Sequence, residues 1–361
     1  MKRTISLKLL TSPEQTSALN ALQKAFNQAC NLIVPIAQEQ RCWNRVALHH
    51  LTYYSIRETS PLGSQMVCNA IKAVCDAYKV LKLRKKDDVP MITFNEKSSV
   101  HFDKRTYSLQ SENVLSVYTL QGRAYIPFAS GDFQQSYLQQ GVCKEAELLP
   151  RKGVWYFNLV LDFPDVEPKS SGTVLGVDLG ENNIASCSSG KIISGGQIRY
   201  ERDKYLALRR RVQSNGSKSA KQLLKKLSGK EQRHVKHVNH ETSKAIVDEA
   251  IRMNASVIAL EDLTHIRKHI KAGRKVRSRL HRWAWRQLQT FIEYKAAAGG
   301  IQTVYVNPAY TSQTCSKCGN RGSRQKHKFS CSCGNLAHAD VNASKNIAKL
   351  AVSTGAATGK L

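Results

Sequence analysis

The sequence predicts a multidomain α/β protein, in which a helical unit and a β-rich unit precede a mixed sheet flanked by helices. Two observations predict this class. The chain has 361 residues, more than a single ordinary core needs. Its hydrophobic period changes from helical to alternating near residue 90, and after residue 172 β-type runs alternate with helical stripes.

The N-terminal part begins with a strand and continues as helices. Residues 1–10 alternate between apolar and polar side chains, as a strand does. The sequence Ser-Pro-Glu at 12–14 then supplies an N-cap, a proline for the first helical position and an early acid. Apolar stripes at helical spacing run through 19–33 and 67–81. We therefore expect a helical domain over residues 11–86.

The next segment, residues 87–168, consists mainly of short β-branched or alternating runs separated by Gly and Asn. These runs lie at 114–120, 124–128 and 154–161. We expect a β-barrel domain here. Because residues 1–10 are also strand-like, they supply its first strand, and the helical domain is an insertion in the barrel.

The second half of the chain follows the order β-β-β-α-β-α-β-α, which is the order of the ribonuclease H fold. We expect this domain over residues 169–310, with its final helix at 337–352 and a mobile tail at 353–361. The strands are expected at 173–179, 183–188, 191–198, 256–260 and 301–306, and helices at 279–298 and 340–350, after long basic helices.

Three acidic residues stand at the ends of these elements. Asp178 and Glu261 each follow an apolar β-type run, and Asp340 stands where a helix begins. Carboxylates held in this way can converge on a pair of divalent cations about 3.5–4 Å apart, the arrangement used for phosphodiester displacement. The sequence thus predicts Asp178, Glu261 and Asp340 as ligands of two divalent cations.

Four of the ten cysteines have metal-ligand spacing. Cys315 and Cys318 form one pair, and Cys331 and Cys333 form a second. A glycine follows the second cysteine of each pair. This pattern predicts a zinc ribbon over 311–336 with one structural Zn²⁺. The second pair is Cys-x-Cys, so replacement of one cysteine by His327 or His338 remains open. The other six lack such spacing and are expected to be small core side chains: Cys30, Cys42, Cys68, Cys75, Cys143 and Cys187.

The net charge indicates a polyanionic partner. The chain carries 55 Lys and Arg against 27 Asp and Glu, a formal charge of +28. No apolar run approaches the roughly 18 residues of a spanning helix, which favours nucleic acid over a membrane. The N-terminus has no secretory signal, so we expect a cytoplasmic protein. Residues 199–282 alone hold 23 Lys and Arg against 8 Asp and Glu, a bias that favours phosphate contact.

Two further patterns in the basic stretch have simpler explanations. His234, His237 and His240 recur at a spacing of three, but among lysines and arginines and without a partnered carboxylate pattern. We therefore expect them to face nucleic acid or to act as caps, and not to bind a metal. Trp283 and Trp285 alternate with arginines and could stack on bases. Since Trp285 also begins an apolar stripe, core packing is favoured.

The motifs of the second half resemble the TnpB family of insertion-sequence proteins, the transposon-encoded RNA-guided DNA nucleases related to type V CRISPR effectors. The resemblance rests on GVDLG with Asp178, ALEDL with Glu261, NPAYTSQTCSKCG leading into the cysteine pairs, and AHADVNASKNIA with Asp340. It covers residues 172–350 by motif and the N-terminal half only by layout. The shortened second cysteine pair departs from the family pattern.

This resemblance implies a RuvC-type nuclease that holds magnesium at the three acids, and an N-terminal wedge barrel interrupted by a helical recognition domain. It also implies a guide RNA from the element's own end and a double-stranded DNA target beside a short flanking motif. We expect one protein chain on one RNA. A strand-transfer transposase, a guide-directed DNA binder that does not cut and a structure-specific resolvase remain as alternatives.

Overall fold

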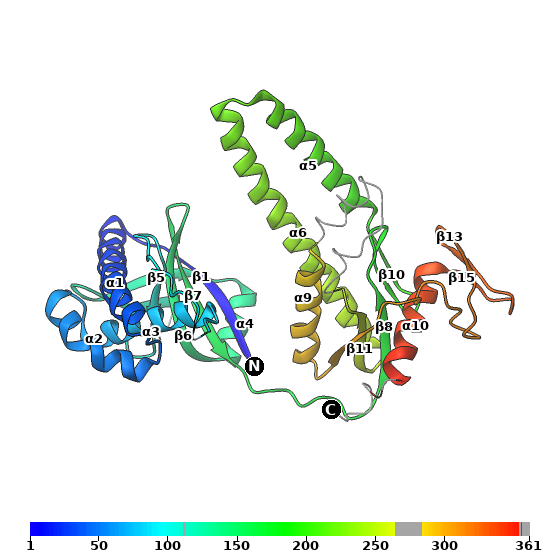
Figure 1. Ribbon diagram of the computed structural model, residues 1–361, viewed down its shortest axis with the longest axis horizontal. Coiled ribbons are helices and arrows are strands. Elements are labelled where there is room, and N and C mark those ends of the chain that lie inside the picture. Colours follow the sequence, from blue (N-terminus) through cyan, green and yellow to red (C-terminus); the bar gives the residue numbers. More distant parts are fainter. Residues whose placement is uncertain (85, 111–112, 264–283, 354, 356–361) are drawn as a thin grey trace. The chain divides into compact units, whose positions relative to one another are not determined.

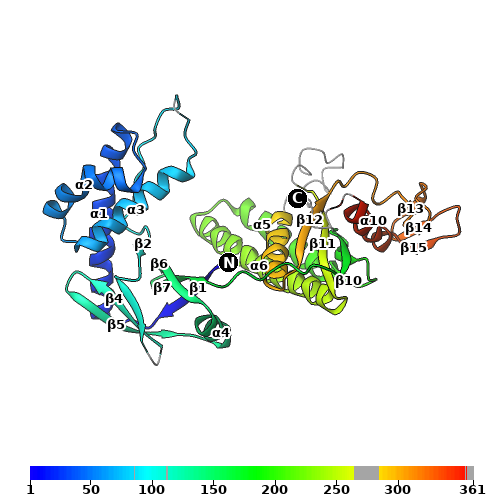
Figure 2. The ribbon, with the colours of Figure 1, turned by 90° about the horizontal axis from the view of Figure 1, so that it is seen from below.

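The computed structural model describes residues 1–84, 86–110, 113–263, 284–353 and 355. Contacts divide the chain into two units, Met1–Pro164 and Asp165–Leu361, drawn in Figures 1 and 2. Within the described ranges, no helix is both long and apolar enough to cross a membrane. Some of the expected features lie outside the described residues: Trp283, residues 279–282 of the expected helix, and most of the expected tail.

The first unit contains an antiparallel sheet of seven strands, in the order β2-β6-β7-β1-β5-β4-β3. Strand β1 pairs with β7 on one side and with β5 on the other, so the first strand of the chain lies at the middle of the sheet. The strands are β1 Lys2–Leu9, β2 Val100–Phe102, β3 Tyr107–Gln110, β4 Val114–Thr119, β5 Gly122–Ala129, β6 Val142–Arg151 and β7 Val154–Asp162.

Four helices accompany this sheet: α1 Pro13–Glu39, α2 Arg45–Thr59, α3 Ser64–Val80 and α4 Asp132–Gln140. The expected cap of the first helix is confirmed, because Ser12 and Gln15 form a reciprocal capping box. Neither α2 nor α4 was anticipated individually. The helix α4 buries no side chain, so its sequence carries no apolar stripe that could have predicted it.

Helices and sheet of the first unit share one hydrophobic core. It includes Leu7 of β1, Phe26 of α1, Val74 of α3 and Phe157 of β7, all fully buried. In sequence, the helices α1 to α3 are inserted between β1 and β2. In space, they pack on the sheet that includes these two strands.

The second unit is built on a mixed five-stranded sheet in the order β10-β9-β8-β11-β12. Strand β11 runs parallel to β8 and β12, whereas β8, β9 and β10 form an antiparallel meander. The expected third strand, 191–198, was too long, because α5 already begins at Gly196. The strands are β8 Thr173–Asp178, β9 Asn183–Cys187, β10 Ile192–Ser194, β11 Ala255–Glu261 and β12 Gln302–Val306.

Helices cover both faces of this sheet (Figure 1). On one face, α6 Lys218–Arg252 and α9 Trp285–Ala298 form a core with the sheet that includes Ile246, Leu260 and Ile292. On the other, α10 Ala339–Ser353 packs Ile347 against Ala259. Adjacent residues of β11 thus face opposite layers, as strand alternation requires.

The helix α5 Gly196–Asn215 precedes α6 and forms a hairpin with it. Gly216 adopts a left-handed φ of 66° at the turn, and the Ser217 side chain caps α6. Val212, Ala220 and Leu227 form a small core between the two helices.

Between β12 and α10 lies a three-stranded sheet of β13 Ser323–Gln325, β14 Lys328–Ser330 and β15 Leu336–His338.

Candidate metal centres

Two of the three predicted acids stand at neighbouring strand ends. Asp178 is the last residue of β8 and Glu261 the last residue of β11. The parallel register pairs Leu260 with Val177, which brings the next residue of each strand to the same edge of the sheet. Both acids follow apolar residues that the sheet buries, so the strands fix the backbone beneath them.

The third acid, Asp340, lies in the first turn of α10 and is 7% exposed. Its helix packs directly on β8. A Cβ placed on Gly176 would lie 2.0 Å from the carbonyl oxygen of Ser344 and 2.6 Å from the backbone nitrogen of Ala348. Because Gly176 has no side chain, the helix approaches close enough to bring Asp340 to the end of β8.

The electrostatics of Asp178 show that the three acids share one region. Burial, followed by the negative charges of Glu261 and Asp340, raises the pKa of Asp178 to about 7, while Arg324 opposes the rise. Burial also raises the pKa of Glu261, against a hydrogen bond from Thr311. A buried group of like charges is a place where a cation lowers the free energy of the ionised form.

Three residues that the sequence did not single out hold these carboxylates. Arg324 of β13 pairs with Asp340 over 2.6 Å, and the Asn183 side-chain amide donates to the other oxygen of Asp340 over 2.9 Å. The Thr311 hydroxyl donates to Glu261 over 2.6 Å. Their motif signal is weak, because each is a common polar residue whose role depends on tertiary contacts.

The acids are not drawn into one tight cluster. Within the described residues, no three oxygens, one each from Asp178, Glu261 and Asp340, lie within 4.8 Å of one another. Like charges repel, and the partners of Asp340 turn its oxygens toward Arg324 and Asn183. Their role as magnesium ligands stays a prediction.

Two asparagines of α10 attach the ribbon to the helix that carries Asp340. The side-chain amide of Asn342 donates to the Thr314 carbonyl over 2.7 Å, and its oxygen accepts from the Ser316 backbone over 2.8 Å. One helical turn later, Asn346 donates to the carbonyls of Thr311 and Thr314 over 2.8 and 2.6 Å. The loop that supplies Thr311 to Glu261 is therefore anchored to α10.

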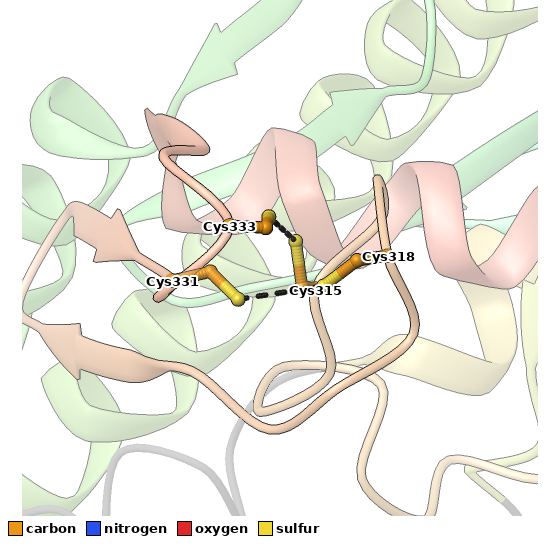
Figure 3. Close-up of side chains that lie close together, drawn as sticks. All are labelled: Cys315, Cys318, Cys331 and Cys333. Carbon is orange, nitrogen blue, oxygen red and sulfur yellow. Dashed lines mark hydrogen bonds between the residues drawn. The ribbon is translucent and has the colours of Figure 1, made fainter.

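The four predicted zinc cysteines come together (Figure 3). The sulfur of Cys315 lies 3.7 Å from that of Cys333, and the sulfur of Cys318 lies 3.5 Å from that of Cys331. Four sulfurs at about 2.3 Å from a tetrahedral Zn²⁺ would be about 3.8 Å apart. Gly319 and Gly334, after the second cysteine of each pair, both adopt φ of 81°, which explains the two glycines. The cysteine geometry fits zinc.

The histidine pair lies elsewhere. His327 and His338 group with Asp340 and not with the cysteines. The shorter second pair therefore still brings both of its sulfurs to the cluster, and neither histidine replaces a cysteine there. Of the other six cysteines, Cys30, Cys75 and Cys187 are buried, and three are half-buried: Cys42, Cys68 and Cys143.

The remaining aromatic and histidine patterns lie on α6 and α9. Trp285 is buried in the core with Leu288 and Ile292, which confirms core packing. His240 stacks on Phe291 with ring centroids 3.9 Å apart, and exposed His237 lies 3.4 Å from Glu241. No metal-binding group found among the described residues includes the three histidines of α6.

Two family models match parts of the chain that lie mainly in the second unit. A family described as "Cas12f1-like, TNB domain" matches residues 285–347, which include the cysteine cluster and Asp340. A second, described as "Probable transposase" of the OrfB_IS605 type, matches residues 159–267, which include Asp178 and Glu261.

Whole relatives extend these matches. A TnpB-like protein of Methanocaldococcus jannaschii is 31% identical over 204 residues, covering 52% of this chain and 72% of that protein. The CRISPR-associated endodeoxyribonuclease Cas12f1 of Sulfoacidibacillus thermotolerans is 33% identical over 220 residues, 55% of this chain and 50% of the relative. InsQ of Escherichia coli K12, named as a candidate RNA-guided DNA endonuclease, is 28% identical over 239 residues, 60% and 58% of the two chains. The chain thus spans about half the length of the last two relatives.

Among solved structures, that of the mini-RNA-guided endonuclease CRISPR-Cas_phi3 is similar in fold, with a TM-score of 0.57 at 13% identity, covering 98% of this chain and 92% of that one. The fold match spans both units, whereas the two family matches begin at residue 159, near the end of the first unit. Because nearly three quarters of the M. jannaschii protein aligns above 30% identity, and because the matched segments carry the three acids and four cysteines, this chain belongs to the TnpB family.

Proposed function

We propose that this protein is an RNA-guided DNA endonuclease of an insertion sequence, which cuts target DNA with Asp178, Glu261 and Asp340. The observation that carries the proposal is the group of three carboxylates at two parallel strand ends and one helix start, where their charges act on one another. Relatives similar to this chain include one named as an endodeoxyribonuclease and one named as a candidate RNA-guided DNA endonuclease.

The domain assignment follows from this function. Residues 169–310 and 337–352 form a RuvC-like nuclease domain of the ribonuclease H class, and 311–336 form a zinc ribbon inserted before its last helix. Residues 1–10 and 87–168 form the wedge β-barrel, and 11–86 form the helical recognition domain that reads the short motif beside the target. The central position of β1 in the first sheet and the insertion of α1 to α3 after it support this layout.

The chemistry at the carboxylates is phosphodiester hydrolysis. Two Mg²⁺ ions held by Asp178, Glu261 and Asp340 would activate a water molecule and stabilise the leaving oxygen. The pKa of Asp178 is raised to about 7 in the absence of a cation, and a bound cation would favour the ionised carboxylate. The Thr311 hydroxyl donates to one oxygen of Glu261, and Arg324 places a positive charge beside Asp340.

The four cysteines would hold a structural Zn²⁺. The ribbon takes no part in the chemistry itself, but its anchors on α10 fix the loop that reaches Glu261. A metal that folds the ribbon therefore also supports the orientation of Thr311 and Arg324.

The partners are a guide RNA derived from the transposon end and double-stranded target DNA. A formal charge of +28 favours binding to phosphate through counterion release. In this class of protein, base pairing selects the sequence, and the protein contacts backbone and a short flanking motif. The hairpin of α5 and α6 is strongly basic and largely exposed, which makes it a candidate path for nucleic acid.

The test uses protein purified with its RNA and a DNA that matches the guide. Asp178→Ala, Glu261→Ala and Asp340→Ala should each abolish magnesium-dependent cleavage while guide-directed binding persists. Asp262→Ala is the matched control: Asp262 is exposed, follows Glu261 directly, and should leave cutting nearly normal. An essential Asp262 with a dispensable Glu261 would show that the wrong carboxylate has been assigned.

A second candidate is a DNA strand-transfer transposase, because a family described as "Probable transposase" matches residues 159–267. Such an enzyme would use the same carboxylates, but would join paired DNA ends and need no RNA. A guide-directed binder that does not cut is the third candidate. Two measurements together separate these candidates: sequencing of the nucleic acid that co-purifies with the protein, and the cleavage assay. Discrete RNA together with DNA cutting supports the nuclease. Strand joining without RNA supports the transposase.

A further inference from the structure

A cluster of two histidines and Asp340 lies beside the ribbon, apart from the four cysteines. One ring nitrogen of His327, one of His338 and one carboxylate oxygen of Asp340 lie within 4.8 Å of one another. The β14–β15 pairing sets this arrangement, because it aligns Lys328 with His338 and so places His327 next to the end of β15. A backbone hydrogen bond of 2.8 Å from Ala339 to the carbonyl of His327 fixes the same corner.

A second observation is an unpaired polar atom on one of these histidines. The Nδ1 atom of His338 is buried and has no hydrogen-bond partner among the described residues. An unpaired buried polar atom costs about 1–3 kcal/mol, so it calls for an explanation such as an ion. The ring of His327 stands 5.5 Å from that of His338, is exposed to solvent, and can turn to let an ion in.

We propose that His327, His338 and Asp340 form a binding site for a transition-metal cation of the Zn²⁺ type, distinct from the ribbon zinc. Two imidazoles and a carboxylate suit Zn²⁺, Co²⁺ or Ni²⁺, whereas Mg²⁺ prefers oxygen ligands alone. Ligand bonds of about 2.0–2.2 Å place donors at most about 4.4 Å apart. The three donors, all within 4.8 Å of one another, lie close to that spacing.

The site would regulate the nuclease, and this part rests on the proposed function. Asp340 belongs both to the histidine cluster and to the carboxylates proposed to hold magnesium. An ion bound by His327 and His338 draws one oxygen of Asp340 toward β15 and competes with magnesium for it. Cutting should therefore fall as zinc rises, at magnesium concentrations that otherwise support full activity.

The experiment uses the full chain with its RNA, after its first zinc equivalent is loaded. Calorimetric titration with Zn²⁺ should show a second equivalent. Replacing His327 with alanine should weaken this second equivalent about tenfold or more, and leave the first one in place. His237→Ala, at an exposed histidine of α6, is the matched control and should bind two equivalents as the unmodified protein does.

Cobalt gives an independent readout, because its absorption spectrum distinguishes nitrogen and oxygen ligands from four sulfurs. Zinc inhibition is then measured for each protein relative to its own zinc-free rate, and His327→Ala should require more zinc for the same inhibition. A single zinc equivalent, or a second equivalent that His327→Ala leaves unchanged, would overturn the site. A protein that binds the second ion normally but cuts no DNA would support the site and overturn the proposed function.

Discussion

Arg324 and Asp340 form an ion pair of 2.6 Å between the first strand of the ribbon and the first turn of α10. Sixteen positions separate them in sequence, and the side chain of Arg324 is 36% exposed, that of Asp340 only 10%. The guanidinium also lowers the pKa of Asp178 against the effects of burial and of its acidic neighbours. Arg324 therefore supplies positive charge to a group of carboxylates that would otherwise repel one another.

Replacing Arg324 with alanine should destabilise the protein when magnesium is absent. The loss should be about 1–2 kcal/mol, less than for a fully buried pair because Arg324 is partly exposed. Added magnesium should then raise the melting temperature more than in the unmodified protein, since no guanidinium has to leave Asp340. Thermal unfolding with and without Mg²⁺ measures both effects.

Arg321→Ala is the matched control, because Arg321 lies in the same ribbon but stacks over the Tyr310 ring at 4.5 Å. It should show the ordinary response to magnesium. The same magnesium response in both variants would mean that Arg324 does not hold Asp340 in solution.

The zinc ribbon can be tested through one cysteine. Cys315→Ser should reduce the zinc content by about one ion per chain and lower the melting temperature, because the sulfur of Cys315 lies in the cysteine cluster and also accepts from Asn335 over 3.2 Å. Metal analysis and thermal unfolding measure the two effects. Cys68→Ser, at a half-buried cysteine outside the cluster, should keep its zinc. If Cys315→Ser retains both zinc and stability, the cysteines hold no ion.

The sequence located the sheet of the second unit because each strand is a continuous apolar run with a clear end. Burial of β11 on both faces makes such a run, and Glu261 marks its end at the edge of the core. By the same logic, Asp340 was placed at a helix start, and α10 begins one residue earlier. These positions follow from local patterns.

The partners of the acids follow from no local pattern. Arg324 lies in a basic segment between two cysteine pairs, where nothing distinguishes it from Arg321. Its role depends on how the three short strands fold back toward α10. Thr311 is likewise one of several threonines and serines in its loop, and only the anchors from Asn346 bring it to Glu261. Such contacts between distant segments require the tertiary structure.

Gly176 tests how tightly α10 must pack. Alanine at this position would place its Cβ against the backbone of α10, which cannot move aside as a flexible side chain can. We expect a loss of about 2–3 kcal/mol in unfolding free energy, and a loss of cleavage as Asp340 moves away from Asp178. Denaturant unfolding and the cleavage assay measure the two effects.

The control for Gly176 is Gly229→Ala, inside α6, where the new Cβ meets only the end of the Arg233 side chain at 3.4 Å. Higher helix propensity should make this variant more stable by about 0.5–1 kcal/mol. Equal effects of the two substitutions would show that α10 does not press on β8.

The last prediction concerns Glu249, a buried acid of α6 that is 4% exposed. Hydrogen bonds from Arg252 hold the pKa of Glu249 at about 2, with help from Ser189 and Lys191 and against the effect of burial. The folded pKa is below the ordinary value near 4.5, so the ionised carboxylate stabilises the fold above about pH 4.5. This contribution is lost as the pH falls from there toward 2. Glu249→Gln should therefore cost about 1–2 kcal/mol at pH 7.

The cost of Glu249→Gln should shrink as the pH is lowered below about 4.5, because the unmodified protein then loses the same charge. Urea unfolding at a series of pH values measures the difference between the two proteins. Glu241→Gln provides the comparison on the same helix, since Glu241 is 68% exposed and pairs with the exposed His237. It should change stability little at any pH. If the difference in unfolding free energy between Glu249→Gln and the unmodified protein stayed constant down to pH 3, the charge of the Glu249 carboxylate would not be what stabilises the fold.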